Sequence, residues 1–199
     1  STWLTKSILK RLYCVVGEST WLTKSILKRL YCVVGVSEAI CETIKAKYSF
    51  NRVTCIQNPI ETFKLTDLET IKGNYILAYG RLDDEIKNYS LLLDAFAQSK
   101  LPENNFKLLI LGSGKDEALL KDKVKTLHLT QKVVFKPFVT NPSAYIKNAH
   151  FVCLTSRVEG FPRTLVESLS LGVPVVSVDC KSGPKEIIVH KKKKPQGKI

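Results

Sequence analysis

From residue 75 onward, short runs of consecutive apolar residues alternate with longer segments in which apolar residues recur every three or four positions. The apolar runs predict strands at 75–79, 107–111, 133–135, 151–154 and 173–178. The segments between them predict helices at 90–98, 115–127, 143–148 and 164–171. Strands that are apolar throughout and alternate with helices are buried on both faces. The pattern therefore predicts an α/β fold with a doubly wound, Rossmann-like parallel sheet.

The chain upstream of this pattern opens with a repeat, because the sequence STWLTKSILKRLYCVVG occupies residues 1–17 and again 19–35. The identity of the two copies favours a recent duplication or a cloning artefact over a repeat architecture. Leu4, Ile8 and Leu12 share one helical face, which predicts an amphipathic basic helix ending in a short strand. We expect this helix either to pack on its own domain or to lie on an anionic lipid surface.

A smaller α/β segment lies between the repeat and the main pattern. Strands are predicted at 33–36 and 53–57, and Ser37 is a suitable N-cap for the helix between them. Asn58-Pro59 ends the second strand, and the polar residues that follow predict a linker. The sequence thus divides into a duplicated helical segment, a short α/β segment, a linker, a Rossmann-like domain and a basic tail, with bounds at 1–35, 36–58, 59–74, 75–190 and 191–199.

The formal net charge of +13 lies mostly at the two ends of the chain. Residues 1–35 carry six Lys or Arg against one Glu, and residues 191–199 carry five Lys, so the ends hold ten of the thirteen net charges. A protein that binds nucleic acid over its whole surface is therefore disfavoured. The six cysteines form no CxxC pair and are expected to be reduced. With no apolar run long enough to span a membrane and no signal peptide, we expect a cytoplasmic protein.

Three loops at predicted carboxyl strand ends carry the candidate chemistry, because ligands of doubly wound sheets bind there. After the first strand, Arg81 and Lys87 offer two cations that could meet one anionic group or could be ordinary surface charges. After the second strand, Gly112-Ser113-Gly114 is only a partial dinucleotide fingerprint. We interpret it as a turn that brings backbone close to a ligand or to the next helix.

The third loop runs through EGFPR into the helix at 164–171. The first turn of that helix presents free N–H groups with a partial positive charge, which suits a phosphate. Glu159 precedes the turn and Glu167 lies in the helix, so both could accept hydrogen bonds from sugar hydroxyls. The alternative is that one carboxylate favours the helix dipole and the other is exposed on the surface.

These residues resemble glycosyltransferase family four, the group one glycosyl transferases, over about residues 33–190. The matching elements are Gly80-Arg81-Leu82, Lys87, the segment EGFPRTLVE from Glu159 to Glu167, Gly172-Val173-Pro174-Val175-Val176 and the stretch from Asp179 to Ile188. The resemblance implies a GT-B fold, in which two Rossmann-like domains face each other and the second holds the sugar donor. Residues 36–58 would be a remnant of the first domain, and residues 75–190 would be a nucleotide-sugar-binding domain, here truncated.

The resemblance also implies roles for individual residues, with Glu159, Arg81 and Lys87 as the catalytic group. Arg81 and Lys87 would bind the donor diphosphate, Glu159 the hexose hydroxyls and Glu167 the ribose. Backbone N–H groups would cradle the sugar and phosphates near Gly160, Phe161, Thr164 and Leu165. No metal or other cofactor is expected, because fixed cations and a helix N-terminus can stabilise the departing diphosphate.

The function implied is retaining transfer of a hexose or N-acetylhexosamine from a UDP-sugar to a glycan or lipid-linked acceptor, in polysaccharide or lipopolysaccharide biosynthesis. The short segment before residue 75 predicts that turnover is impaired while donor binding is kept. The alternatives are an inactive UDP-sugar-binding remnant, a basic module that binds membrane or nucleic acid, and a nucleotide-sugar epimerase. Nucleic acid is not an expected partner, whereas peripheral contact with an anionic inner membrane surface is compatible with the basic ends.

Overall fold

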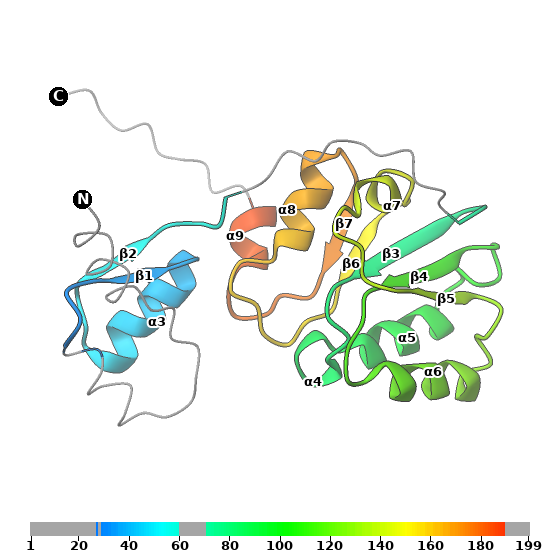
Figure 1. Cartoon of the computed structure of the whole chain (residues 1–199), viewed down its shortest axis with the longest axis horizontal. Helices are drawn as coiled ribbons and strands as arrows, with labels where there is room; N and C mark the ends of the chain where they lie inside the picture. The colour runs from blue at the N-terminus through cyan, green and yellow to red at the C-terminus, as the bar shows by residue number, and fades with distance from the viewer. Residues whose placement is uncertain (1–26, 28, 60–70, 190–199) are drawn as a thin grey trace.

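The computed structural model describes residues 27, 29–59 and 71–189, which form a five-stranded unit and a small two-stranded unit (Figure 1). Most of the repeat, the linker between 60 and 70 and the basic tail lie outside the described residues. The strands of the larger unit are β3 (Tyr75–Tyr79), β4 (Lys107–Leu111), β5 (Val133–Lys136), β6 (Val152–Leu154) and β7 (Val175–Ser177). All their pairings are parallel, in the order β5-β4-β3-β6-β7, which confirms the doubly wound sheet.

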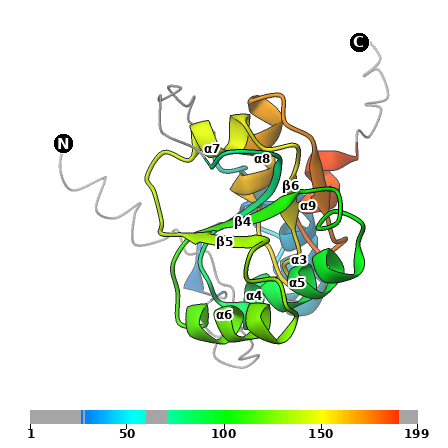
Figure 2. The same cartoon turned by 90° about the vertical axis from the view of Figure 1, so that its right-hand side faces the viewer.

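Helices cover both faces of this sheet, as the alternating pattern predicts. They are α4 (Asp84–Lys87), α5 (Tyr89–Gln98), α6 (Glu117–Thr126), α7 (Ser143–Lys147), α8 (Arg163–Ser170) and α9 (Pro184–Ile188). Figure 2 shows α5 and α6 on one side of β4 and β5, and α7 and α8 on the other. Successive residues of β3 alternate between two hydrophobic clusters, with Ile76 and Ala78 in one and Tyr75 and Leu77 in the other. Both faces of the sheet are therefore part of the core.

Helix α4 forms inside the loop that the sequence predicts after the first strand. The Lys87 N–H donates to the Asp83 carbonyl at 2.8 Å, and the Asn88 N–H donates to the Asp84 carbonyl at 3.0 Å. The Asp84 carboxylate also accepts from the N–H of Ser90 at 2.8 Å. A helix of one turn leaves almost no periodic pattern in the sequence, so only these contacts with its surroundings define it.

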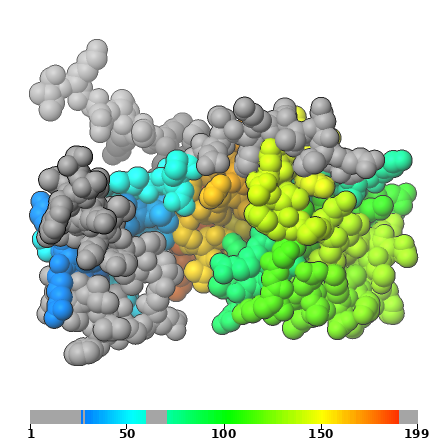
Figure 3. Space-filling model, in the orientation of Figure 1, coloured from blue at the N-terminus to red at the C-terminus, as the bar shows by residue number. Residues whose placement is uncertain are grey.

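The small unit consists of β1 (Val33–Gly35), α3 (Glu38–Tyr48) and β2 (Val53–Cys55), with the two strands paired in parallel. Ser37 caps α3, as expected, because its hydroxyl oxygen accepts from the Ile40 N–H at 3.3 Å. A single apolar cluster holds the unit together, with Leu27, Leu30, Val33, Ile44 and Phe50 buried in it. Figure 3 shows this unit, in blue and cyan, at one end of the molecule and the larger unit at the other.

Candidate functional site

The candidate site lies where the strand order reverses. Chain connections leave β3 toward β4 on one side and enter β6 on the other, so the loops after β3 and β6 lie side by side at the carboxyl edge. The Arg157 N–H donates to the Ile86 carbonyl at 2.8 Å, and the Thr155 hydroxyl donates to the Lys87 carbonyl at 3.1 Å. Such a reversal is the usual ligand crevice of an open α/β sheet. The segments that carry Arg81, Lys87 and Glu159 therefore meet at this reversal point.

Lys87 and Glu159 form an ion pair across these two loops. The Lys87 ammonium lies 2.7 Å from Glu159 Oε1, and the side chains are 22% and 9% exposed respectively. Such short, mostly buried contacts are charge-assisted hydrogen bonds that are stronger than exposed ion pairs. The two residues come from loops 72 positions apart in the sequence. The structure thus joins two predicted site residues as one acidic and basic pair.

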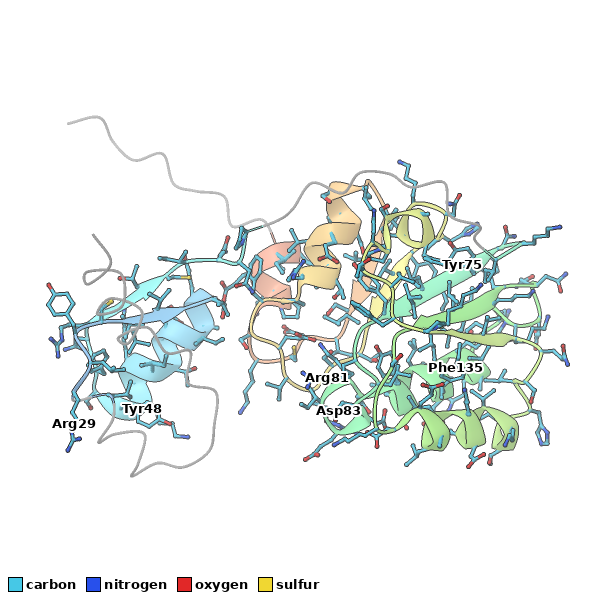
Figure 4. All side chains as sticks on the ribbon, in the orientation of Figure 1. Arg29, Tyr48, Tyr75, Arg81, Asp83 and Phe135 are labelled. Carbon is cyan, nitrogen blue, oxygen red and sulfur yellow. The ribbon has the colours of Figure 1, made fainter. Side chains whose placement is uncertain are left out.

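Arg81 lies at the same edge but apart from this pair. Its side chain is exposed, and it forms no ion pair with another residue of the described part of the chain. Figure 4 places it beside Asp83 at the end of the sheet nearest the small unit, whereas Tyr75 marks the opposite end. An unpaired guanidinium at this edge is available to bind an anion.

The Gly112-Ser113-Gly114 turn packs against the loop that carries Arg81. The Gly80 N–H donates to the Leu111 carbonyl and the Leu82 N–H donates to the Ser113 carbonyl, both at 3.0 Å. A Cβ atom on Gly114 would lie 2.2 Å from the Leu82 carbonyl oxygen, so only glycine allows this approach. The turn thus packs against the neighbouring loop. Its close approach to a ligand stays a prediction.

The N-terminus of α8 is left without a side-chain cap. Pro162 occupies the N-cap position, and among the described residues no side chain accepts a hydrogen bond from the N–H groups of the first turn. Of the predicted backbone donors, Leu165 already donates to the Pro162 carbonyl at 3.1 Å. The N–H groups of Gly160, Phe161 and Thr164 have no recorded acceptor among the described residues. The first turn therefore keeps donors that an anionic ligand could use.

Glu167 lies on α8 and is buried, which excludes the alternative of a surface-exposed carboxylate. The Tyr79 hydroxyl donates to Glu167 Oε2 at 2.9 Å, and Arg163 lies 3.1 Å from Oε1. Burial, together with the negative charge of Glu167, raises the pKa of Tyr79 well above its ordinary value. Tyr79 therefore stays protonated as a donor. Glu167 also lines a shallow hollow with Phe161 and, from the small unit, Asn58 and Pro59.

Several residues of the site are not among those that the sequence predicts. Tyr79 ends the apolar run YILAY, and its hydroxyl is the local signal of a polar role, a signal that Tyr75 at the start of the run shares. The Ser182 hydroxyl donates to the Glu159 carbonyl, and a Cβ on Gly183 would lie 2.5 Å from Pro162 Cδ. The loop after β7 thus supports the Glu159–Pro162 turn. The hydroxyls of Ser156 and Thr164 are buried beside this turn without a hydrogen-bond partner among the described residues.

Residues 27, 29–59 and 71–189 contain no group of three or more His, Cys, Asp or Glu side chains placed to hold a metal ion. Within the same ranges, no helix has the length and apolar character that crossing a bilayer requires.

Comparison with known proteins agrees with the resemblance seen in the motifs. Residues 62–197 match the family model "Glycosyl transferases group 1". The chain is 32% identical over 146 residues to the amylovoran biosynthesis glycosyltransferase AmsD of Erwinia amylovora, an alignment that covers 73% of this chain and 41% of that protein. It is 34% identical to the lipopolysaccharide 1,6-galactosyltransferase of Escherichia coli K12, covering 68% and 39% respectively. The chain thus spans less than half the length of these curated relatives.

Solved structures show the same architecture. The apo lipopolysaccharide outer core galactosyltransferase WaaB superposes with a TM-score of 0.66 at 29% identity, covering 83% of this chain and 48% of that chain. The Anabaena protein HepE in complex with UDP-glucose gives a TM-score of 0.74 at 20% identity, covering 86% and 51%. At that identity the second likeness concerns the fold alone. Both comparisons support a GT-B arrangement of which this chain represents about half.

Proposed function

The chain belongs to the group 1 glycosyl transferase family, and from that premise we propose that it carries the donor-binding half of a retaining glycosyltransferase that uses a UDP-sugar. The observation that carries this proposal is the Lys87–Glu159 pair at the sheet's reversal point, beside the uncapped N-terminus of α8. A cation, a carboxylate and free backbone donors meet there. Those are the groups needed to hold a phosphate and a sugar in adjacent positions.

In the proposed transfer, the bond between the anomeric carbon and the diphosphate oxygen breaks, and the electron pair leaves with UDP. The acceptor hydroxyl forms the new bond on the same face of the sugar, and its proton passes to the departing diphosphate. Arg81 and Lys87 would stabilise the developing negative charge, together with the first turn of α8. Exposed Arg81 can reach a ligand without breaking an existing ion pair.

Lys87 has a second task in this proposal, because it holds Glu159 before the donor arrives. The pair fixes the carboxylate at the rim, where it can accept hydrogen bonds from hexose hydroxyls. Buried Glu167 would recognise the ribose, and its two partners Tyr79 and Arg163 orient it for that contact. Two side chains therefore hold the Glu167 carboxylate in a fixed position.

The class of donor and acceptor is inferred from relatives. HepE is solved with UDP-glucose, and the Staphylococcus aureus protein TarM with UDP, which supports a UDP-sugar as the donor of this chain. A Campylobacter jejuni relative, 41% identical over 119 residues, is named for a transferase that acts on a diphospho-undecaprenol acceptor. We therefore propose a glycan or lipid-linked acceptor in surface polysaccharide synthesis.

Donor binding is tested by calorimetry and thermal shift with UDP-, GDP- and ADP-sugars. We expect binding of a UDP-sugar, and a loss of about tenfold or more in affinity for Lys87→Ala, since a charge-assisted contact is worth about 1.5–3 kcal/mol. Lys100→Ala is the matched control, because Lys100 is exposed at the opposite edge of the sheet. Failure of every nucleotide sugar to bind would contradict the proposal.

The single variant also leaves Glu159 without its partner, which lowers stability by itself. The double variant Lys87→Ala with Glu159→Gln removes both charges, so we expect its stability to recover while its affinity stays low. Recovery of affinity in the double variant would show that Lys87 acts only on Glu159.

Transfer is tested separately, with radiolabelled UDP-sugar and a polyprenyl-linked acceptor. Transfer that disappears in Glu159→Ala would exclude the alternative of an inactive UDP-sugar-binding remnant. Binding without transfer in the parent chain would favour that alternative and would leave the donor-site proposal intact.

A further inference from the structure

Glu186, on α9, reaches from the larger unit to the small one. Its Oε2 accepts from the N–H of Glu38 and its Oε1 from the N–H of Ala39, both at 2.9 Å. These donors are the first two residues of α3, and 147 or more positions separate them from Glu186 in the sequence. A carboxylate that bonds two amides of a helix's first turn is held by hydrogen bonds and by the helix dipole together.

The first turn of α3 is thereby completed by two different units. Ser37, within the small unit, accepts from the Ile40 N–H, while Glu186 supplies the two remaining contacts from outside. The small unit therefore contains only part of its own helix cap.

On its other side, Glu186 is connected to the candidate site. Helix α9 follows directly after Gly183, whose Cα faces the Gly160–Pro162 turn so closely that a Cβ would lie 2.9 Å from the Gly160 carbonyl oxygen. The preceding residue, Ser182, donates to the carbonyl of Glu159. The residues from 182 to 186 thus link the turn that carries Glu159 to the helix cap of α3.

The small unit also touches this turn directly. A Cβ atom on Gly160 would lie 3.1 Å from Val36 Cγ2 and 3.5 Å from Ile40 Cδ1. Val36 and Ile40 flank the α3 cap that Glu186 binds, so the cap contact and the apolar contact restrain the same few residues. The start of α3 therefore forms a wall beside the sugar end of the proposed donor site.

We propose that Glu186 is a positioning residue that locks the start of α3 against the Glu159–Pro162 turn and so sets the sugar end of the donor site. The inference rests on the proposed function. It assigns no contact between Glu186 and the donor. The diphosphate cations Arg81 and Lys87 belong to the segment between β3 and α5, so Glu186 should affect recognition of the sugar far more than recognition of UDP itself.

The experiment combines hydrogen exchange with binding in Glu186→Ala and Glu186→Gln. We expect the amides of Glu38 and Ala39 to exchange at least tenfold faster in Glu186→Ala, with a smaller change in Glu186→Gln, which keeps one carbonyl oxygen as an acceptor. Exchange in α5 should not change. Glu42→Gln is the matched control, because Glu42 is an exposed carboxylate on α3 and forms no side-chain contact among the described residues.

The binding measurement separates positioning from mere stability. In Glu186→Ala we expect the affinity for a UDP-sugar to fall about tenfold while the affinity for UDP stays within about twofold. Faster exchange with an unchanged ratio of the two affinities would overturn the positioning role. Unchanged exchange at Glu38 and Ala39 would show that Glu186 does not hold the start of α3.

Failure of the proposed function gives a different pattern. If the parent chain binds neither UDP nor a UDP-sugar, the donor-site proposal fails, and the exchange rates at Glu38 and Ala39 still decide whether Glu186 holds α3. Should Glu186→Ala not fold, as judged by circular dichroism, Glu186→Gln provides the same comparison with a milder change.

Discussion

The five-stranded unit and the small unit differ in how far each supplies its own strand pairing, apolar core and helix caps. In the larger unit, strands β4, β3 and β6 are paired on both sides, and hydrophobic clusters fill both faces of the sheet. The small unit has two described strands and one cluster, and it borrows part of its helix cap from Glu186. The cation end of the candidate site therefore belongs to the larger unit alone. Its sugar end, at the Glu159–Pro162 turn, also contacts the small unit.

The difference also explains where function can vary. Binding groups on loops that a rigid sheet supports keep their positions, whereas a weakly held neighbour can open and close. Arg81 and Lys87 belong wholly to the larger unit, whereas the turn at Glu159 contacts both units. Three experiments, in order of decreasing expected effect, test this difference between the two units.

The largest effect is expected from Gly112→Ala, which breaks the larger unit. An added Cβ would lie 1.9 Å from the Gly80 carbonyl oxygen, a backbone atom that cannot move aside. We expect a loss of about 3 kcal/mol or more in the free energy of unfolding, measured by urea denaturation. Gly172→Ala is the control, because its φ is also positive, at +74°, but nothing lies within 4 Å of the new atom. Its cost should be about 1 kcal/mol, and equal losses in the two variants would contradict the steric explanation.

Much of the larger unit could be predicted from the sequence because its strands are locally encoded. The runs YILAY and KLLIL coincide with β3 and β4, since their apolar residues face one of two apolar layers. The predicted end strand, in contrast, was too long, and β7 begins only at Val175. Pro174 has no N–H to donate to the sheet, so the preceding apolar residues cannot extend the strand. Ser37 was found correctly because an N-cap acts within three residues of itself.

The site's contacts could not be predicted, because they depend on which strands become neighbours. The sequence indicated Lys87 and Glu159 separately, but their pairing requires β6 to lie beside β3 rather than beside β5. The hydrogen bond of Glu167, on α8, likewise requires Tyr79 from the distant strand β3. Glu186 lies in the stretch from Asp179 to Ile188 that resembles the family, but its partners are two backbone amides of a distant helix, which no local pattern indicates. Roles of the site residues in binding remain predictions that the donor experiments test.

An intermediate effect is expected in thiol labelling, which compares the two units directly. Burial raises the pKa of Cys153, in β6, to about 12, and mainly burial raises that of Cys55, in β2, to about 11. Only the thiolate reacts with iodoacetamide, so one pKa unit corresponds to about tenfold in reactive species at pH 8. Cys55 is also partly exposed, whereas Cys153 is buried. Peptide mapping by mass spectrometry should therefore find Cys55 labelled at least tenfold faster.

The pH of this assay follows from the sign of the two shifts. A thiol whose folded pKa is raised from 9.0 stabilises the fold fully below pH 9, and this contribution is lost as the pH rises toward 12. Labelling at pH 8 therefore samples the fully stabilised protein. Both thiols should react at similar rates in guanidinium chloride, which provides the control. Faster labelling of Cys153 than of Cys55 in the folded chain would contradict this expectation.

The smallest effects are expected at the two ends of α3, where two substitutions should act in opposite directions. Ser37→Ala removes the acceptor of the Ile40 N–H and should destabilise the helix by about 1 kcal/mol. Ser49→Gly should stabilise it by about 0.5 kcal/mol, because Ser49 ends the helix with φ at 51°, a conformation that glycine adopts without strain. Hydrogen exchange in α3 measures both changes locally, and urea denaturation measures them globally. If the small unit opens by itself, exchange in α3 should change while the urea midpoint of the larger unit stays fixed. A midpoint that shifts by the amount expected from these free-energy changes would mean that the two units unfold together. The contacts of Glu186 and Gly160 would then be strong enough to couple the unfolding of the two units.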